Sequence, residues 1–422
     1  MENNLYDFIV VGSGAGGSTI IKELVSRGAK ILLIEKGSPF RKLGKFFPSL
    51  SFYNFNKYTK MPQKTIEGVN YYQGFAFGGT TLFSCGNAVV SLKNELLKIG
   101  VDIADEIREI QKEIPYNKTD KSLFSSFTNE VIKTCSTNRI MFEVMTKFIE
   151  NKKCIKCGNC VFGCKYGAKW SSNKLIDKKE LDIKFNSNAI RVITNKGKAI
   201  GIEYQLNKQL NKAYGKNIII SAGAIHTPII LLNSGLVAGE NLSLDLFVNV
   251  YGSSSSFTQI NEPVMPIVYL EKSISDGFII SPFINQPFFI RMFESNLKTA
   301  MIKKQNLVGF MVKIKDDSNG NVFKNGRVSK PVTNEDMNKI NKGINLSKDI
   351  MDSLGVEDIS VTCMQGAHPI GTAAIGTVVD NKNFMTEIKN LYVCDSSILP
   401  EAPGLPPILT IMALAKKFTK QF

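Results

Sequence analysis

Three glycines near the start of the chain constrain the fold more than any other feature. Gly12, Gly14 and Gly17 follow a short apolar run and precede apolar residues at helical spacing, and a second apolar run then ends in Glu35. Such glycines let the backbone turn tightly and let a pyrophosphate reach the positive end of a helix, while the acidic residue accepts hydrogen bonds from a ribose. The pattern predicts a βαβ unit that binds a dinucleotide, and it does not separate FAD from NAD.

A second motif is a group of four cysteines, Cys154, Cys157, Cys160 and Cys164. Cysteines spaced in this way in bacterial ferredoxins wrap a loop around a [4Fe–4S] cluster. Ferredoxins usually carry a proline after the last cysteine, whereas Lys165 follows here, so the ligands are either four thiolates or three with another group. We expect an iron–sulfur cluster, either [4Fe–4S] or [3Fe–4S]. Structural zinc is the second interpretation, because four thiolates also suit a tetrahedral ion, and unligated thiols are the third.

Composition and charge narrow the class of protein. The 422 residues include 43% hydrophobic and 21% charged residues, which is typical of a folded globular chain with room for an enzyme. No run approaches the roughly 18–20 apolar residues of a spanning helix, and the amino-terminal residues do not resemble a cleavable leader. We therefore expect a cytoplasmic protein, in contact with a membrane surface at most. The net charge of +15 favours an acidic partner or an anionic surface. Nucleic acid is not expected, because the lysines are dispersed.

Histidine chemistry has only two candidates in this sequence, His226 and His368. His226 lies where a strand is expected to lead into a helix, which favours a buried or capping role. His368 lies in a glycine-rich turn, which favours a catalytic acid or base.

Several segments together resemble the glucose-methanol-choline (GMC) oxidoreductases. They are VVGSGAGG with Glu35, GFAFGGTTLFSCGNAV, SAGAIHTPIILLNSG, HPIGT and LYVCDSSILPEAPGLPPILTIMALA, in the family's order, and they cover about half of the chain. CIKCGNCVFGCKYGAK is similar to the cysteine segment of a subset of the family, which includes FAD-dependent sugar dehydrogenases with an iron–sulfur cluster. The resemblance implies an α/β fold with a discontinuous Rossmann-like FAD-binding domain and a smaller α+β substrate domain that contains an antiparallel sheet.

The expected domain boundaries follow from this resemblance and from shifts in composition. Residues 1–95, 155–244 and 361–422 would form the FAD-binding domain, with residues 96–153 as a helical insertion and residues 245–360 as the substrate or cap domain. The phenylalanine-rich run at residues 278–293 is expected to form strands beside a pocket.

The resemblance also assigns residues to a non-covalent FAD, since the glycine-rich segment at residues 74–86 has no histidine that could bind the flavin covalently. The glycines near the start of the chain and Glu35 would hold the ADP half of FAD, and a second pair of glycines would approach the pyrophosphate and the flavin. One valine would touch the adenine region, and one aspartate would lie near the ribityl chain. The start of the last helix would face the edge of the flavin ring. These residues are Gly12, Gly14, Ala15, Gly17, Glu35, Lys36, Gly78, Gly79, Thr80, Asn87, Val192, Ala222, Asp395 and Pro407.

For the reaction, the resemblance implies that His368 removes the proton of a substrate hydroxyl while a hydride moves to the flavin. The family usually has an asparagine or histidine where this chain has Pro406, which offers no side-chain donor. Three alternatives remain open: His368 works alone, Asn87 or Gln365 substitutes, or the chain no longer oxidises ordinary alcohols.

The first functional prediction is a dehydrogenase for an alcohol, polyol or sugar. Its electrons would pass through the cysteine-bound cluster to an acceptor protein or quinone, with additional subunits as candidate partners. A reductase fed by a ferredoxin-like donor is the second reading, and a non-catalytic FAD-binding electron-transfer subunit is the third. A single tryptophan, Trp170, leaves few stacking platforms for a sugar ring, so we expect an alcohol less polar than glucose.

Overall fold

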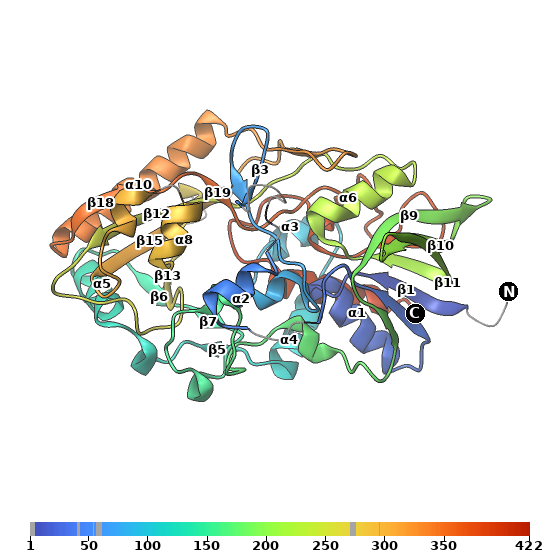
Figure 1. Ribbon diagram of the computed structural model, residues 1–422, viewed down its shortest axis with the longest axis horizontal. Helices are drawn as coiled ribbons and strands as arrows, with labels where there is room; N and C mark the ends of the chain where they lie inside the picture. The colour runs from blue at the N-terminus through green and yellow to red at the C-terminus, as the bar shows by residue number, and fades with distance from the viewer. Residues whose placement is uncertain (1–4, 40–42, 54, 56–60, 271–275, 295) are drawn as a thin grey trace.

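The computed structural model describes residues 5–39, 43–53, 55, 61–270, 276–294 and 296–422. Two large sheets organise these residues, one of seven strands and one of nine. Figure 1 shows the long helix α10 (Asn334–Ser353) at one end of the molecule and the strands β9 (Ser187–Asn195) and β10 (Lys198–Leu206) at the other. The fold is therefore the α/β arrangement with a second, largely antiparallel sheet that the sequence predicts.

The seven-stranded sheet has a parallel centre in the order β8, β2, β1, β11 and β20. These strands are β8 (Asp182–Lys184), β2 (Ile31–Ile34), β1 (Tyr6–Val11), β11 (Gln209–Ile220) and β20 (Leu391–Val393). The apolar runs of β1, β2 and β20 are buried on both faces, as is usual for parallel strands covered by helices, whereas the edge strand β8 is largely exposed. The strands β9 and β10 continue the sheet from β11 as an antiparallel meander.

Helices cover this first sheet. They are α1 (Ala15–Val25), α3 (Lys93–Lys98), α4 (Ala104–Glu113), α6 (Gly223–Asn233) and α11 (Ile408–Thr419). α11 packs against both α1 and α4. Lys416 of α11 lies 2.9 Å from a carboxylate oxygen of Glu23 in α1 and 2.5 Å from one of Glu113 in α4, which links the three helices.

The nine-stranded sheet has the order β3, β4, β19, β12, β15, β14, β13 and β6, with β18 also paired to β12. Its strands are β3 (Gln63–Lys64), β4 (Asn70–Tyr71), β6 (Phe142–Val144), β12 (Leu246–Ser253), β13 (Ile267–Tyr269), β14 (Phe278–Pro282), β15 (Leu307–Ile314), β18 (Glu357–Val361) and β19 (Gln365–Gly366). Helix α10 lies against β12, β14 and β15. It begins with a capping box between Thr333 and Asp336, which satisfies backbone N–H groups that a helix start leaves unpaired.

The remaining helices and strands are short, except for the 12-residue helix α5. They are α2 (Phe46–Leu50), β5 (Asn117–Lys118), α5 (Ser126–Thr137), β7 (Thr146–Lys147), α8 (Pro287–Phe293), α9 (Leu297–Ala300), β16 (Asn321–Val322) and β17 (Val328–Ser329). Among the helices of the described residues, none is long and apolar enough to cross a membrane.

Two local expectations need correction. The phenylalanine-rich run at 278–293 forms only one strand, β14, and its second half is helix α8, because Pro287 suits the first turn of a helix. The segment 96–153 is not helical throughout: besides α4 and α5 it contributes β6 to the nine-stranded sheet. The three-residue strand β6 is too short for its periodicity to be read from the sequence.

Gly17→Ala is expected to reduce the free energy of unfolding by about 1–3 kcal/mol. A Cβ at residue 17 would lie 2.0 Å from the carbonyl oxygen of Gly12, so helix α1 and the loop before it would have to separate. Gly14→Ala is the matched control, because a Cβ there meets no atom within 4 Å. Urea unfolding of the flavin-free proteins measures both, and equal stability of the two variants would contradict this account of the packing.

Candidate active site

A cavity of about 490 Å³ lies between the two sheets. At one end its wall includes Val11, Ile34, Ser221 and Asp395, which end or follow the parallel strands β1, β2, β11 and β20. Ligands of open α/β sheets bind at this carboxyl edge. At the other end the wall is made by the nine-stranded sheet and by His368. The volume is within the range of small-molecule sites.

The loop before α1 leaves its backbone open to the cavity. Gly12, Gly14 and Gly16 all line the wall. A Cβ at residue 12 or 16 would collide with the carbonyl oxygen of Ser221 or Cys394, at 2.3 and 2.2 Å, whereas a Cβ at Gly14 would project into empty space. The amino terminus of α1 thus has room for a phosphate group against its backbone N–H groups.

Glu35 is held by the same loop. Its carboxylate accepts hydrogen bonds from the N–H and hydroxyl of Ser13, at 2.8 and 2.6 Å, and from the N–H of Gly37 at 2.6 Å. Burial raises the pKa of Glu35, and these hydrogen bonds oppose the rise. Ser13 also accepts a hydrogen bond from the N–H of Gly78 at 2.9 Å, which joins the two glycine-rich segments. Ser13 carried no signal of its own in the sequence.

Asp395 fixes two turns at the cavity wall. Its carboxylate accepts hydrogen bonds from the N–H of Gly223 at 2.8 Å, from the hydroxyl of Thr227 at 2.6 Å and from the N–H of Ser397 at 2.7 Å. Burial raises the pKa of Asp395, and the same hydrogen bonds oppose that rise. Asp395 therefore positions the start of α6 as well as facing the cavity.

The cavity brings together most of the residues expected to hold FAD. Those that line it are Gly12, Gly14, Ala15, Glu35, Lys36, Gly79, Thr80, Asn87, Ala222, Asp395 and Pro407. Gly17, Gly78 and Val192 do not. Val192 is buried in β9, where its N–H donates to the hydroxyl of Ser234, and its neighbours Ala189 and Ile190 line the wall instead. The open backbone at Gly14, the ring of small residues and Glu35 fit an adenine dinucleotide.

His226 lies inside helix α6 rather than at its cap. Its ring packs on Phe75, with 5.2 Å between the ring centroids, and its Nε2 is 3.5 Å from Nζ of Lys36. Loss of hydration and the Lys36 ammonium lower the pKa of His226 to about 3, so this histidine is neutral at physiological pH.

His368 belongs to a compact group of three charged or ionisable side chains. Its Nδ1 lies 2.8 Å from Oδ2 of Asp245, and Nζ of Lys313 lies 3.4 Å from each of these two atoms. The other oxygen of Asp245 accepts the N–H of Gly404 at 2.9 Å. Because Asp245 binds Nδ1, Nε2 is the nitrogen that remains for proton transfer.

Burial lowers the pKa of His368, the Lys313 charge lowers it further, and Asp245 opposes both effects. No sequence motif marks Asp245 or Lys313. Each is a charge inside an otherwise apolar strand region, LDLFV and FMVKI, and that interruption is the signal that could have identified them.

Asn87 and Gln365, the two residues considered as substitutes at Pro406, both face the cavity, but their polar groups already have partners. Asn87 accepts a hydrogen bond from Lys147 through Oδ1, and its Nδ2 lies 3.4 Å from the sulfur of Met265. Gln365 accepts the hydroxyl of Tyr72 at 2.8 Å, and its Nε2 donates to Thr362 at 3.3 Å.

Around His368 the wall is mainly apolar. It is formed by large side chains of the nine-stranded sheet, its connections and α8: Phe247, Met265, Phe283, Phe289 and Met311. Trp170 packs against Phe148 in the core and does not line the cavity.

The four cysteines lie in a loop next to this wall. Their thiols are near enough that Cys160, Cys157 and Cys164 each raise the pKa of Cys154, although burial is the larger cause. Among the residues that the structure describes, however, no three histidine, cysteine or carboxylate side chains are grouped as metal ligands. The predicted iron–sulfur cluster and the alternative zinc site are therefore not supported by the described residues.

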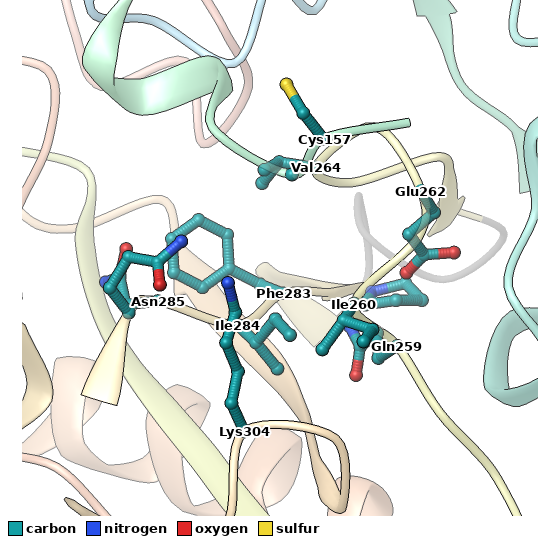
Figure 2. A pocket seen from close by; sticks show the side chains of 12 residues that line it. Cys157, Gln259, Ile260, Glu262, Val264, Phe283, Ile284, Asn285 and Lys304 are labelled. Atoms are coloured by element: carbon teal, nitrogen blue, oxygen red, sulfur yellow. The ribbon is translucent and has the colours of Figure 1, made fainter. Parts of the chain in front are cut away.

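A second cavity separates Cys157 from the end of β14. Figure 2 shows the Cys157 sulfur pointing away from Asn285 and Lys304, which stand on the other side. The cavity has a volume of about 20 Å³, which suits about one water molecule and no substrate.

Models of known families match two parts of the chain, and both are described as GMC oxidoreductase, at residues 99–248 and 327–415. The uncharacterised protein MJ1450 of Methanocaldococcus jannaschii is 32% identical over 99% of this chain and all of its own length. Long-chain-alcohol oxidase FAO3 of Arabidopsis thaliana is 24% identical to this chain. The match covers 97% of this chain and 66% of the length of that enzyme.

Among solved structures, formate oxidase of Aspergillus oryzae, a protein described with FAD, superimposes with a TM-score of 0.78. The superposition covers 100% of this chain and 98% of that one at 15% identity, so it shows the shared fold. Together with the two family matches and the full-length relative, these findings show that the chain belongs to the GMC oxidoreductase family, whose members are FAD-dependent enzymes acting on CH–OH donors.

Proposed function

We propose that this enzyme is a dehydrogenase for alcohols of low polarity and that His368 is its catalytic base. The observation that carries the proposal is a single cavity bounded by the dinucleotide loop at one end and by His368 with an apolar wall at the other. The FAD-binding residues proposed are those expected from the sequence, with Ala189 and Ile190 in place of Val192 near the adenine.

When bound, FAD supplies the acceptor for a hydride from the carbinol carbon. A side chain of the protein accepts the proton of the substrate hydroxyl. Nε2 of His368 accepts the proton of the substrate hydroxyl, and Asp245, bound to Nδ1, stabilises the imidazolium that results. The substrate loses one proton and one hydride, and its carbinol carbon becomes a carbonyl carbon.

The apolar wall supports a substrate with a hydrocarbon chain rather than a polyol or sugar. Phe247, Met265, Phe283 and Met311 are all buried side chains that offer no strong hydrogen-bond donor or acceptor to substrate hydroxyls. A sugar hydroxyl against such a wall would lose its hydration without compensation. The similarity to long-chain-alcohol oxidases supports the same substrate class.

The division into domains at residues 1–95, 155–244 and 361–422, with 96–153 and 245–360 as insertions, remains part of this proposal. Its support is that four of the nine strands of the second sheet, β12 to β15, and the helix α10 that covers them lie within 245–360. The net charge of +15 supports an acidic acceptor protein or a quinone at an anionic surface as the electron acceptor.

Electron transfer through an iron–sulfur cluster stays a prediction that only the cysteine spacing supports, and no step of the reaction is assigned to it. Iron and zinc assays with an EPR spectrum of anaerobically purified protein test it. A cluster requires stoichiometric iron that Cys160→Ser removes. Flavin-containing protein without iron would exclude the relay, and zinc in its place would assign the loop a structural role.

Primary alcohols of increasing length are expected to bleach the flavin under anaerobic conditions, with kcat/KM rising about threefold to fourfold per methylene until the apolar wall is covered. Glucose and glycerol serve as controls and should react far more slowly. A preference for sugars would contradict the proposed substrate class. Bleaching by no alcohol, combined with reoxidation of the reduced protein by a carbonyl compound, would favour a reductase.

His368→Asn is expected to slow flavin reduction by about 10²–10⁴-fold, because the general base is lost. In the unmodified enzyme the base works when neutral, and its pKa lies below the ordinary value of 6.5. The acid limb of kcat/KM should therefore lie below pH 6.5, with full activity at neutral pH. His226→Asn, at the cavity wall beside Lys36, is the comparison and should keep the acid limb. An acid limb above pH 7 would contradict the assignment.

A further inference from the structure

Pro406 has no side-chain donor, so His368 is the one polar side chain that the proposed reaction places on the substrate oxygen. We propose that Lys313 is the second: its ammonium, held beside His368 by Asp245, contacts the oxygen of the substrate CH–OH group. This inference rests on the proposed function and assigns a role to a side chain that the sequence motifs do not mark.

Position is the first support. Lys313 lies near the end of β15, lines the cavity and is within 3.4 Å of Nδ1 of His368. Pro406 and Pro407 line the same cavity. Lys313 of β15 can therefore reach the part of the cavity that the family's usual asparagine or histidine would reach from the start of the last helix.

Hydrogen-bond capacity is the second support. An ammonium has three donors, and Lys313 Nζ lies at 3.4 Å from each of two neighbours, Oδ2 of Asp245 and Nδ1 of His368. With Nδ1 of His368 donating to Asp245, the imidazole offers no lone pair on that side to Lys313. A substrate oxygen in the cavity would be an acceptor for the remaining capacity of Lys313.

Burial is the third support. The side chains of Lys313 and Asp245 are 2% and 0% exposed, and the other residues of the LVGFMVKI strand are apolar or glycine. A buried ion pair stabilises a fold less well than apolar side chains of similar volume would. Retaining one at the wall of a reaction cavity, in contact with the proposed base, indicates a chemical role.

Two other buried lysines, which donate to residues at or near the cavity wall, have different partners. Lys147 donates to Asn87 and to the carbonyl of Val264, and Lys169 donates to the carbonyls of Thr81, Leu82 and Ser84. Neither is in hydrogen-bond contact with His368.

Burial lowers the pKa of Lys313, and the charges of Asp245 and, at longer range, Asp316 oppose that fall. Lys313 and Asp245 are the charged groups that act on His368. As the hydroxyl proton moves to Nε2 of His368, negative charge grows on the substrate oxygen, and a fixed ammonium there lowers the barrier.

Histidine NMR tests the arrangement without relying on activity. The chain has two histidines, so ¹³C-histidine labelling gives two signals, and His226→Asn assigns them. Lys313→Met removes the positive charge and should raise the His368 midpoint by about one pH unit, whereas Asp245→Asn should lower it. Lys315→Met, a charge loss just beyond the same strand at a side chain 43% exposed, is the control and should leave it unchanged.

Flavin reduction by an alcohol at pH 8.5 separates the two ways in which Lys313 could act. His368 is neutral in every variant at this pH, so a lost contact with the substrate oxygen remains visible as a rate reduced by about 10²–10³-fold in Lys313→Met. Lys313→Arg should recover part of it. Full recovery of the Lys313→Met rate at high pH would overturn the contact, and an unmoved His368 midpoint would overturn the juxtaposition.

Failure of the proposed function is a separate outcome. If no alcohol reduces the flavin of the unmodified enzyme, the proposed function fails while the NMR midpoints still report on Lys313. If Lys313→Met does not fold, Lys313→Gln replaces it. Lys313→Gln should raise the His368 midpoint, and Asp245→Asn should lower it.

Discussion

Direct contact between the glycines in and just before the first turn of α1 and nearby backbone carbonyls is the constraint on which the site depends. Gly12, Gly16 and Gly17 each lie where a Cβ would come within 2.3 Å of a carbonyl oxygen. This packing brings the start of α1 to the carboxyl edge of the sheet, and the open position at Gly14 then faces the cavity. That open position leaves room for the phosphates of the proposed FAD.

The site also depends on charged side chains that are buried. Asp245 and Lys313 are almost fully buried, and each lowers the cost of burying the other while the pair fixes His368. Asp395 and Glu35 are also buried carboxylates, and each is satisfied by backbone N–H groups of the loops that it organises. The polar groups of the site are thus positioned before any ligand arrives, which reduces the reorganisation needed during reaction.

The sequence predicted what depends on local pattern. The first βαβ unit follows from apolar periodicity and glycine positions, and it forms as β1, α1 and β2. The sequence could not predict the contact of Asp245, Lys313 and His368, because these residues come from three segments far apart in the chain. The helix α8 was mistaken for strand because phenylalanine favours both environments, and the cysteine spacing alone did not determine whether the thiols would converge.

The central claim is that one cavity holds FAD against a CH–OH donor whose carbinol hydrogen leaves as hydride while His368 takes the hydroxyl proton. Anaerobic single-turnover reduction of the flavin by a long-chain primary alcohol, compared with the same alcohol deuterated at the carbinol carbon, tests this claim most directly. The account predicts complete bleaching that is several times slower with the deuterated alcohol. Bleaching at equal rates would mean that another step limits reduction, and no bleaching by either alcohol would contradict the account.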